Sequence, residues 1–198
     1  GRRAPSAPTR MGRSVAEQED VLVEAQRVLS YQFQNLDLLR VALTHASSAD
    51  DRLASNERME FLGDAVLGMV VCEYLYRQYT DLLEGEMTKI KSAVVSRRLC
   101  AQLTEDLGLD GLLTLGKGMK TRGSIPPSLS AAALEAAIGA IFLDGGLERV
   151  REFLLPLVAP HVDEAYHNGH QQNFKSVLQQ HAQTVMDAEV EYVLMDEK

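Results

Sequence analysis

Acidic side chains are the residues of this chain whose types and spacing could support chemistry. Glu57, Glu60 and Asp64 are three and four residues apart, which places them on one stripe of a helix. The stretch around them is strongly apolar, and neighbouring carboxylates repel one another, the more so when they are partly buried. A solvated acidic face would explain the stripe, and so would a shared divalent cation, because Mg²⁺ prefers carboxylate oxygens and water.

A second acid stands alone in a run of small and apolar residues. Glu135 is the only charged residue between Arg122 and Asp144, and the alanines around it permit close contact between helices. The carboxylate could simply lie on the one solvent-exposed edge of an otherwise buried helix. It is better explained if it faces the first acidic stripe across a shared cation, although spacing alone does not show that the two helices meet.

Helical periodicity over most of the chain predicts the elements that must position these acids. Apolar residues recur at helical spacing in segments near residues 15–29, 36–44, 56–79, 86–107, 129–143, 147–166 and 173–184. Pro156 and Pro160 are expected to break or kink the helix that contains them. Residues 108–128 hold five glycines and two prolines, which predicts a long loop.

Composition predicts how the chain is divided into domains. Residues 1–14 contain four arginines and no acid and are interpreted as a disordered basic tail, residues 15–166 as one helical domain, and residues 167–172 as a polar linker. Residues 173–198 combine one helix with an alternating, strand-like run at 189–195, so the chain contains only the start of a second module. The expected fold class is therefore mainly α, with a truncated α/β domain at the C-terminus.

The overall charge argues against a nucleic-acid binder when it is taken alone. The net charge is −8, and without the four tail arginines the rest of the chain holds 16 bases against 28 acids. An acidic protein can still act on an acidic polymer if its acids hold divalent cations. Cys72 and Cys100 show no metal or disulfide spacing, which predicts a cytoplasmic location. No apolar run reaches the roughly 18–20 residues of a membrane helix, so no membrane partner is expected.

Several motifs resemble one enzyme family. Residues 56–67 (NERMEFLGDAVL) closely resemble the signature helix of the ribonuclease III family, and residues 42–47, 84–87 and 134–146 fit the same family. The resemblance covers about residues 15–165 as an all-helical endonuclease domain, and residues 173–180 resemble the first helix of its double-stranded RNA-binding domain. It implies a homodimer that cuts double-stranded RNA in RNA processing. Each subunit would use Mg²⁺, with Mn²⁺ as a substitute, and leave 5′-phosphate and 3′-hydroxyl ends.

The resemblance also assigns roles to individual positions. It makes Glu60, Asp64 and Glu135 the metal ligands, with Asp64 and Glu135 as catalytic residues. It implies supporting roles for five more positions: accessory cleft acids at Glu57 and Glu84, RNA contacts at Ser176 and Gln179, and a dimer-interface aromatic at Phe61. Without the family, Phe61 would be interpreted equally well as a core residue.

One position departs from the family pattern. Ala132 stands three residues before Glu135, where the family usually has Asp or sometimes Asn, and its methyl group cannot ligate a metal. The leading interpretation is a Mg²⁺-dependent endoribonuclease, and the alternative is a catalytically weak or inactive double-stranded RNA-binding protein on the same fold. The presence of four mutually repelling acids favours the enzyme.

Overall fold

The described part of the chain is helical. The structure is a computed structural model that describes residues 15–116, 119 and 125–185, with only the backbone described for residues 15, 170–178 and 180–185. Its helices are α1 (Val15–Val28), α2 (Leu36–Ala42), α3 (Glu57–Gln78), α4 (Glu84–Val94), α5 (Arg97–Leu107) and α7 (Pro127–Val185), with short 3₁₀ helices at Arg52–Ala54 and Asp110–Leu112. Within these residues the β structure is one isolated bridge, Thr44–Thr114. The mainly α fold class is confirmed.

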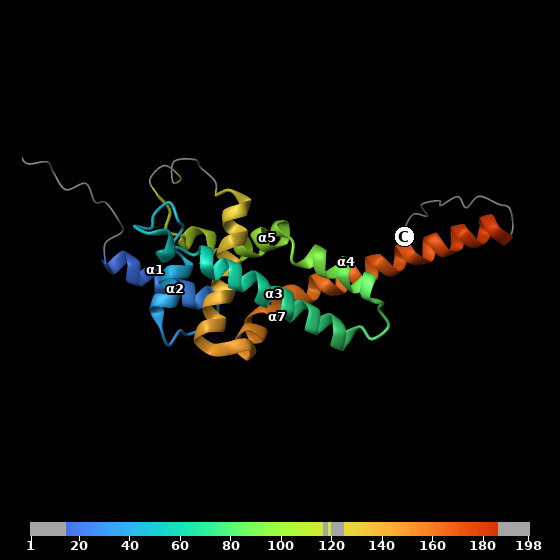
Figure 1. Cartoon of the computed structure of the whole chain (residues 1–198), viewed down its shortest axis with the longest axis horizontal. Helices are drawn as coiled ribbons and strands as arrows, with labels where there is room; N and C mark the ends of the chain where they lie inside the picture. Colours follow the sequence, from blue (N-terminus) through green and yellow to red (C-terminus); the bar gives the residue numbers. More distant parts are fainter. Residues whose placement is uncertain (1–14, 117–118, 120–124, 186–198) are drawn as a thin grey trace, which may run out of the picture.

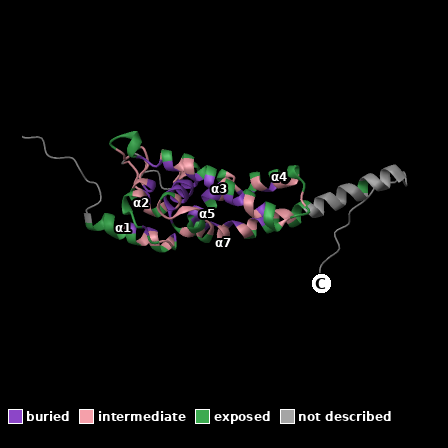
Figure 2. Cartoon of the chain, turned by 60° about the horizontal axis from the view of Figure 1, so that its bottom comes forward, coloured by how far each residue is buried: buried purple, intermediate pink, exposed green. Residues whose placement is uncertain are grey.

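Helix α3 and the first part of α7 lie at the centre of this fold (Figure 1). Helices α2, α4 and α5 also pack against α7 (Figure 1), and Figure 2 shows the buried residues concentrated where α3, α5 and α7 come together. The first part of α7 is buried on almost every side, as expected for a helix that is apolar around its circumference. By length and composition alone, Pro127–Gly169 could also cross a membrane, but 61% of its most apolar stretch is buried inside the protein.

Two glycines allow the backbones of α3 and α7 to touch. A Cβ atom added at Gly63 would lie 1.6 Å from the carbonyl oxygen of Glu135, and one added at Gly139 would lie 2.5 Å from the carbonyl oxygen of Met59. Real Cβ atoms do not come this close to backbone, so this crossing requires glycine at both positions. The crossing places the start of α3 directly against the turn of α7 that carries Glu135.

The segment expected to be one helix, residues 86–107, is two. Helix α4 ends at Val94 and α5 begins at Arg97, and the Ser96 Oγ accepts a hydrogen bond from the Leu99 N–H at 3.3 Å as the N-cap of α5. The prediction of a single helix is wrong because apolar spacing continues across the break. The serine cap was the local indication of a new start.

The C-terminal helices differ from expectation in two ways. The predicted stop at residues 144–146 is present as a kink, with φ 79° and ψ −176° at Gly146, but Pro156 and Pro160 both lie inside the helical segment without a break. Complete burial of α7 positions such as Leu154 and Val158 offsets the hydrogen bonds that prolines remove.

The helix also continues through residues 167–172, the segment expected to be a polar linker between two helices. Whether those residues separate two domains stays a prediction. The predicted tail at 1–14 and the predicted strand at 189–195 lie outside the described residues.

Candidate active site

Four acids from two helices line a single pocket. The cavity has a volume of about 540 Å³ and is lined by Glu57, Glu60, Phe61, Asp64, Val95, Arg97 and Glu135; we call it the acid pocket. The spacing on α3 predicted that the first three acids share a stripe. The structure adds Glu135 from α7, which the glycine crossing brings to the same place.

The carboxylates that line the acid pocket outnumber the basic side chains that could balance their charge. Glu135 is only 8% exposed, and burial, followed by the charges of Asp64 and Glu60, raises its pKa to about 7. Burial also raises the pKa of Glu60, and the nearby acids add to that shift. Arg97 opposes both shifts. Such repulsion favours occupation by a cation.

The chemistry of these side chains suits a hard divalent cation. Glu60, Asp64 and Glu135 present only carboxylate oxygens to the pocket, which are the ligands that Mg²⁺ and Mn²⁺ accept. In the part of the chain that the structure describes, however, no three Asp, Glu, His or Cys side chains are close enough together to form a ready-made metal site. A bound cation would therefore have to draw the carboxylates toward itself.

Glu57 differs from the other acids because it has a direct partner. The Arg52 guanidinium donates to both Glu57 carboxylate oxygens, at 3.1 and 2.6 Å. These hydrogen bonds are the main reason that the pKa of Glu57 is lowered. The acidic stripe is therefore not made of unpaired acids throughout, and the polar segment before α3 gave no pattern that would have identified Arg52.

A histidine near the acids was also not singled out from the sequence. The His45 Nδ1 atom lies 2.9 Å from the Ser47 Oγ and accepts from the Ser47 N–H at 3.1 Å. The same hydroxyl oxygen accepts from the Gly116 N–H at 2.9 Å, so a loop far along the chain holds the imidazole. The charge of His45 contributes to lowering the pKa of Glu57 and opposes the raised pKa of Glu60.

Phe61 is not a core residue. Its side chain is 82% exposed at the edge of the acid pocket, which contradicts the core-packing alternative. Glu84 is not brought to the acid pocket of its own chain. It lines a separate, mostly apolar groove between α3 and α4, together with Met69, Cys72 and Tyr76.

The remaining predicted positions either do not line the acid pocket or have side chains outside the described residues. Ala132 is half-buried, one turn before Glu135, and does not line the acid pocket. Gln179 is exposed on α7, and the side chain of Ser176 lies outside the described residues. The structure therefore leaves the roles assigned to these three positions as predictions.

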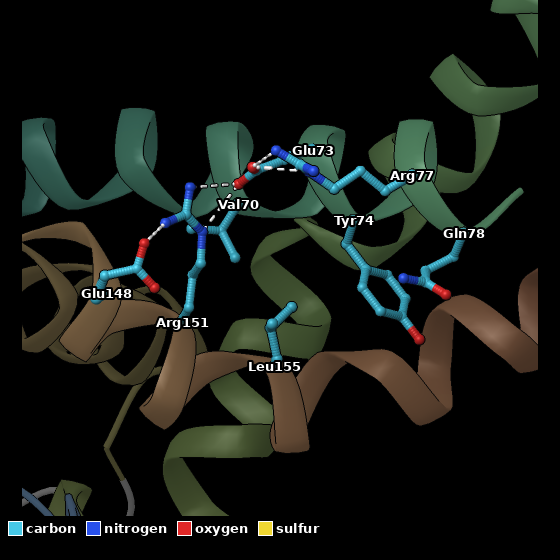
Figure 3. A pocket seen from close by; sticks show the side chains of 8 residues that line it. All are labelled: Val70, Glu73, Tyr74, Arg77, Gln78, Glu148, Arg151 and Leu155. Atoms are coloured by element: carbon cyan, nitrogen blue, oxygen red, sulfur yellow. Dashed lines mark hydrogen bonds and ion pairs between the residues drawn. The ribbon is translucent and has the colours of Figure 1, made fainter.

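A third pocket, between α3 and α7, is lined in part by ion-paired side chains (Figure 3). Arg151 donates to Glu73 at 2.9 and 2.5 Å and also pairs with Glu148, while Arg77 donates to Glu73 at 3.0 Å. We call these four residues the ionic clamp. Its carboxylates are compensated by neighbouring guanidinium groups, so they have no need of a metal ion.

Comparison with known proteins gives one consistent result. The sequence model of the Ribonuclease-III-like family matches residues 35–161. Ribonuclease 3 of Rhodopirellula baltica is 51% identical over 87% of this chain and 65% of its own length. Ribonuclease 3 of Oceanobacillus iheyensis is 41% identical over 86% of this chain and 76% of its own length. The chain thus spans about two thirds to three quarters of these relatives.

A solved structure agrees with the sequence comparisons. The nuclease domain of ribonuclease III from Campylobacter jejuni, which was described for flexibility in a region involved in dimer formation, matches with a TM-score of 0.66 and 36% identity. The match covers 70% of this chain and 96% of that chain. The family match over residues 35–161 includes all the residues that line the acid pocket.

Proposed function

The chain belongs to the ribonuclease III family, and from that premise we propose that it is an endoribonuclease that hydrolyses double-stranded RNA in RNA processing. The observation that carries the proposal is the acid pocket, a cavity that Glu60 and Asp64 of α3 line together with the buried Glu135 of α7. A cluster of this kind is unfavourable in a purely structural role, because each carboxylate raises the free energy of the others. Its relatives named Ribonuclease 3 support the same activity.

In this proposal the acids of the pocket have different roles. Glu60, Asp64 and Glu135 would hold Mg²⁺, or Mn²⁺ in its place, and such an ion would lower the pKa of water and neutralise charge on the phosphate. Close packing at Gly63 fixes Glu135 in position relative to α3. Glu57, restrained by Arg52, lies at the pocket edge where it can orient water or RNA. The expected products carry 5′-phosphate and 3′-hydroxyl ends.

An exposed apolar stripe on α3 supports a homodimer. Phe61, Ala65, Met69, Cys72 and Tyr76 recur at helical spacing, and all five are exposed. Exposed apolar surface of this kind marks an interaction site, and the commonest symmetric solution places the same patch of two copies face to face. Glu84 borders this stripe, which is consistent with a role at the dimer cleft. Sedimentation should show a dimer, and a monomer at micromolar concentration would contradict this part of the proposal.

The alternative function rests on Ala132. A methyl group there supplies no ligand, so a protein that binds duplex RNA without cutting it is the second candidate. Mg²⁺ commonly takes only one or two ligands from protein carboxylates, with water filling the rest. We therefore propose that Ala132 weakens metal binding without abolishing cleavage.

One experiment separates the two candidates. The parent chain and Ala132→Asp are each incubated with a long RNA duplex across a Mg²⁺ titration, and the ends of the products are determined. The enzyme proposal expects Mg²⁺-dependent cutting by the parent, and a lower metal requirement in Ala132→Asp. An inactive parent that Ala132→Asp rescues would favour the binding-only function. If both proteins fail to cut but bind the duplex, the nuclease proposal is wrong.

A further inference from the structure

Arg97 has a distinctive position in the acid pocket. Seven of the described residues line the cavity, and among these Arg97 is the only one with a basic side chain. It is the first residue of α5, directly after the N-cap Ser96. Its side chain is exposed, so the guanidinium is available to a molecule that enters the pocket.

The backbone under Arg97 is held firmly against α7. The Thr104 hydroxyl donates to the Ser130 carbonyl at 2.7 Å, and both side chains are buried. Cys100, one turn after Arg97, is 1% exposed, and its pKa is raised to about 12 by burial and by the nearby Glu135 and Asp64. The start of α5 is therefore placed beside the acids by core packing, independently of any contact made by the guanidinium.

Neither local stability nor a direct ion pair explains an arginine at this position. The N-terminus of a helix carries partial positive charge, so a cation at the first residue of α5 is unfavourable there. Among the described residues, Arg97 makes no ion pair within 4.0 Å, whereas Arg52 and Arg151 both bind carboxylates directly. Its influence on Glu60 and Glu135 is exerted through space.

We propose that Arg97 is a substrate-contacting residue, whose guanidinium binds a backbone phosphate of the RNA at the edge of the acid pocket. This inference rests on the proposed nuclease function. Four carboxylates repel a phosphate, so a fixed positive charge beside them offsets that repulsion as the RNA arrives. A guanidinium suits the task because its planar N–H donors match phosphate oxygens in pairs. The contact strengthens as negative charge grows on the phosphate during cleavage.

Binding measurements under conditions that block cleavage test this contact. Arg97→Ala, Arg97→Lys and the control Arg98→Ala are each made in the Glu135→Gln background and titrated with a short labelled RNA duplex over a range of NaCl concentrations. Arg98 is a suitable control because it is the next residue of α5, is also exposed, and does not line the pocket. Circular dichroism spectra and melting curves verify that all variants are folded.

A phosphate contact changes the salt dependence of binding, which a purely structural role would not. For Arg97→Ala the slope of log K against log salt should become shallower by about one for each phosphate that is no longer bound. Arg97→Lys should keep the slope, because the charge is still present, while Arg98→Ala should match the parent. In the active background, Arg97→Ala should lower kcat/KM by about 100-fold.

The outcomes distinguish this inference from the proposed function. If the parent cuts RNA but Arg97→Ala keeps both the salt slope and the rate, the inference is wrong and the nuclease function stands. Equal losses in Arg97→Ala and Arg98→Ala would also overturn it, because general surface charge would then be responsible. If the parent binds without cutting and only Arg97→Ala changes the slope, the RNA contact stands while the nuclease proposal fails. A parent that neither binds nor cuts the duplex refutes both.

Discussion

Helices α3 and α7 carry acidic side chains in two regions, the ionic clamp and the acid pocket. The surroundings of the acids shift their pKa values in opposite directions in these two regions. In the ionic clamp, Glu73 of α3 accepts hydrogen bonds from Arg77 and Arg151, and these bonds are the main reason that its pKa is lowered (Figure 3). In the acid pocket, the pKa values of Glu60 and Glu135 are raised because Glu60 is half-buried and Glu135 is buried, each near other acids.

The acids of the ionic clamp therefore stabilise the folded state, whereas those of the acid pocket destabilise it. The clamp acids lie within reach of guanidinium groups, so their charges contribute favourably to the contact between the helices. The pocket acids are brought together by glycine packing, which acts in spite of their repulsion. The ionic clamp can therefore serve as a control for the acid pocket, because the same Glu→Gln substitution should change the metal-free Tm in opposite directions in the two regions.

The largest expected effect is the loss of cleavage in Glu135→Gln. The amide keeps the size of the side chain but removes a charged ligand, so cleavage should fall by about 10³-fold, or about 4 kcal/mol of activation free energy. Mg²⁺ should raise the Tm of the parent by mass action and have little effect on the variant. Duplex cleavage assays and melting curves with and without Mg²⁺ measure both quantities.

Glu73→Gln is the matched substitution in the ionic clamp. It should leave the cleavage rate and the Mg²⁺ response close to those of the parent, and it should lower the Tm in metal-free buffer. Glu135→Gln should instead raise the metal-free Tm near neutral pH, because it removes repulsion. If Glu135→Gln cuts as fast as the parent, the active site has been assigned to the wrong acids.

The next largest effect concerns the glycine packing that assembles the acid pocket. In Gly63→Ala, the new Cβ would overlap the Glu135 carbonyl oxygen, so α3 and α7 would have to separate. The free energy of unfolding should fall by about 3 kcal/mol or more, and cleavage should fall too, because Glu135 moves away from Asp64. Urea denaturation gives the stability, and a duplex assay gives the activity.

Gly68→Ala provides the control on the same helix. A Cβ at Gly68 would lie 3.7 Å from Cε of Lys91, which is ordinary contact. Alanine also favours a helix over glycine by about 1 kcal/mol, so this variant should be as stable as the parent or more stable. Equal destabilisation by both substitutions would show that the close contact at Gly63 is not special.

This crossing also marks the limit of what the sequence could predict. Helical periodicity placed α3 correctly, and the spacing of Glu57, Glu60 and Asp64 identified their shared stripe. The small residues around Glu135 suggested close packing, but no local pattern states which helix is the partner. Arg52 and Arg97 were missed for a similar reason: each reaches the acids from another element, and only the tertiary fold brings them there.

Errors in the predicted helices have physical causes of the same kind. Apolar spacing alone could not reveal the break at Ser96, because both α4 and α5 bury apolar residues at helical spacing. Proline usually ends a helix, but tertiary burial along α7 overrides that local preference at Pro156 and Pro160. The kink at Gly146 was predictable, since two adjacent glycines are a strong local stop.

A smaller effect should appear in the pH dependence of metal-free protein. The pKa of Glu135 is about 7 in the folded state, against an ordinary value of 4.5, so the folded protein binds an extra proton between these limits. The free energy of unfolding should therefore decrease as pH rises through this window. In EDTA, Tm measured from pH 4.5 to pH 7 should fall more steeply for the parent than for Glu135→Gln. Parallel curves would show that the pKa of Glu135 is not raised in the folded protein.

The smallest effect is expected in the ionic clamp itself. Arg151 and Glu73 have side chains that are 22% and 26% exposed, so the pair is only partly screened by solvent. Arg151→Met keeps most of the apolar stem but leaves Glu73 with Arg77 as its remaining partner, and the Tm should fall by about 2–4 °C. Arg149→Met is the control, because its pair with Glu152 is more than half exposed, and such pairs contribute little. Cleavage should be unchanged in both variants, since neither residue lines the acid pocket. If Arg151→Met instead lowered cleavage as strongly as Glu135→Gln, the two regions would be coupled, and the division between stabilising and functional acids on these helices would be wrong.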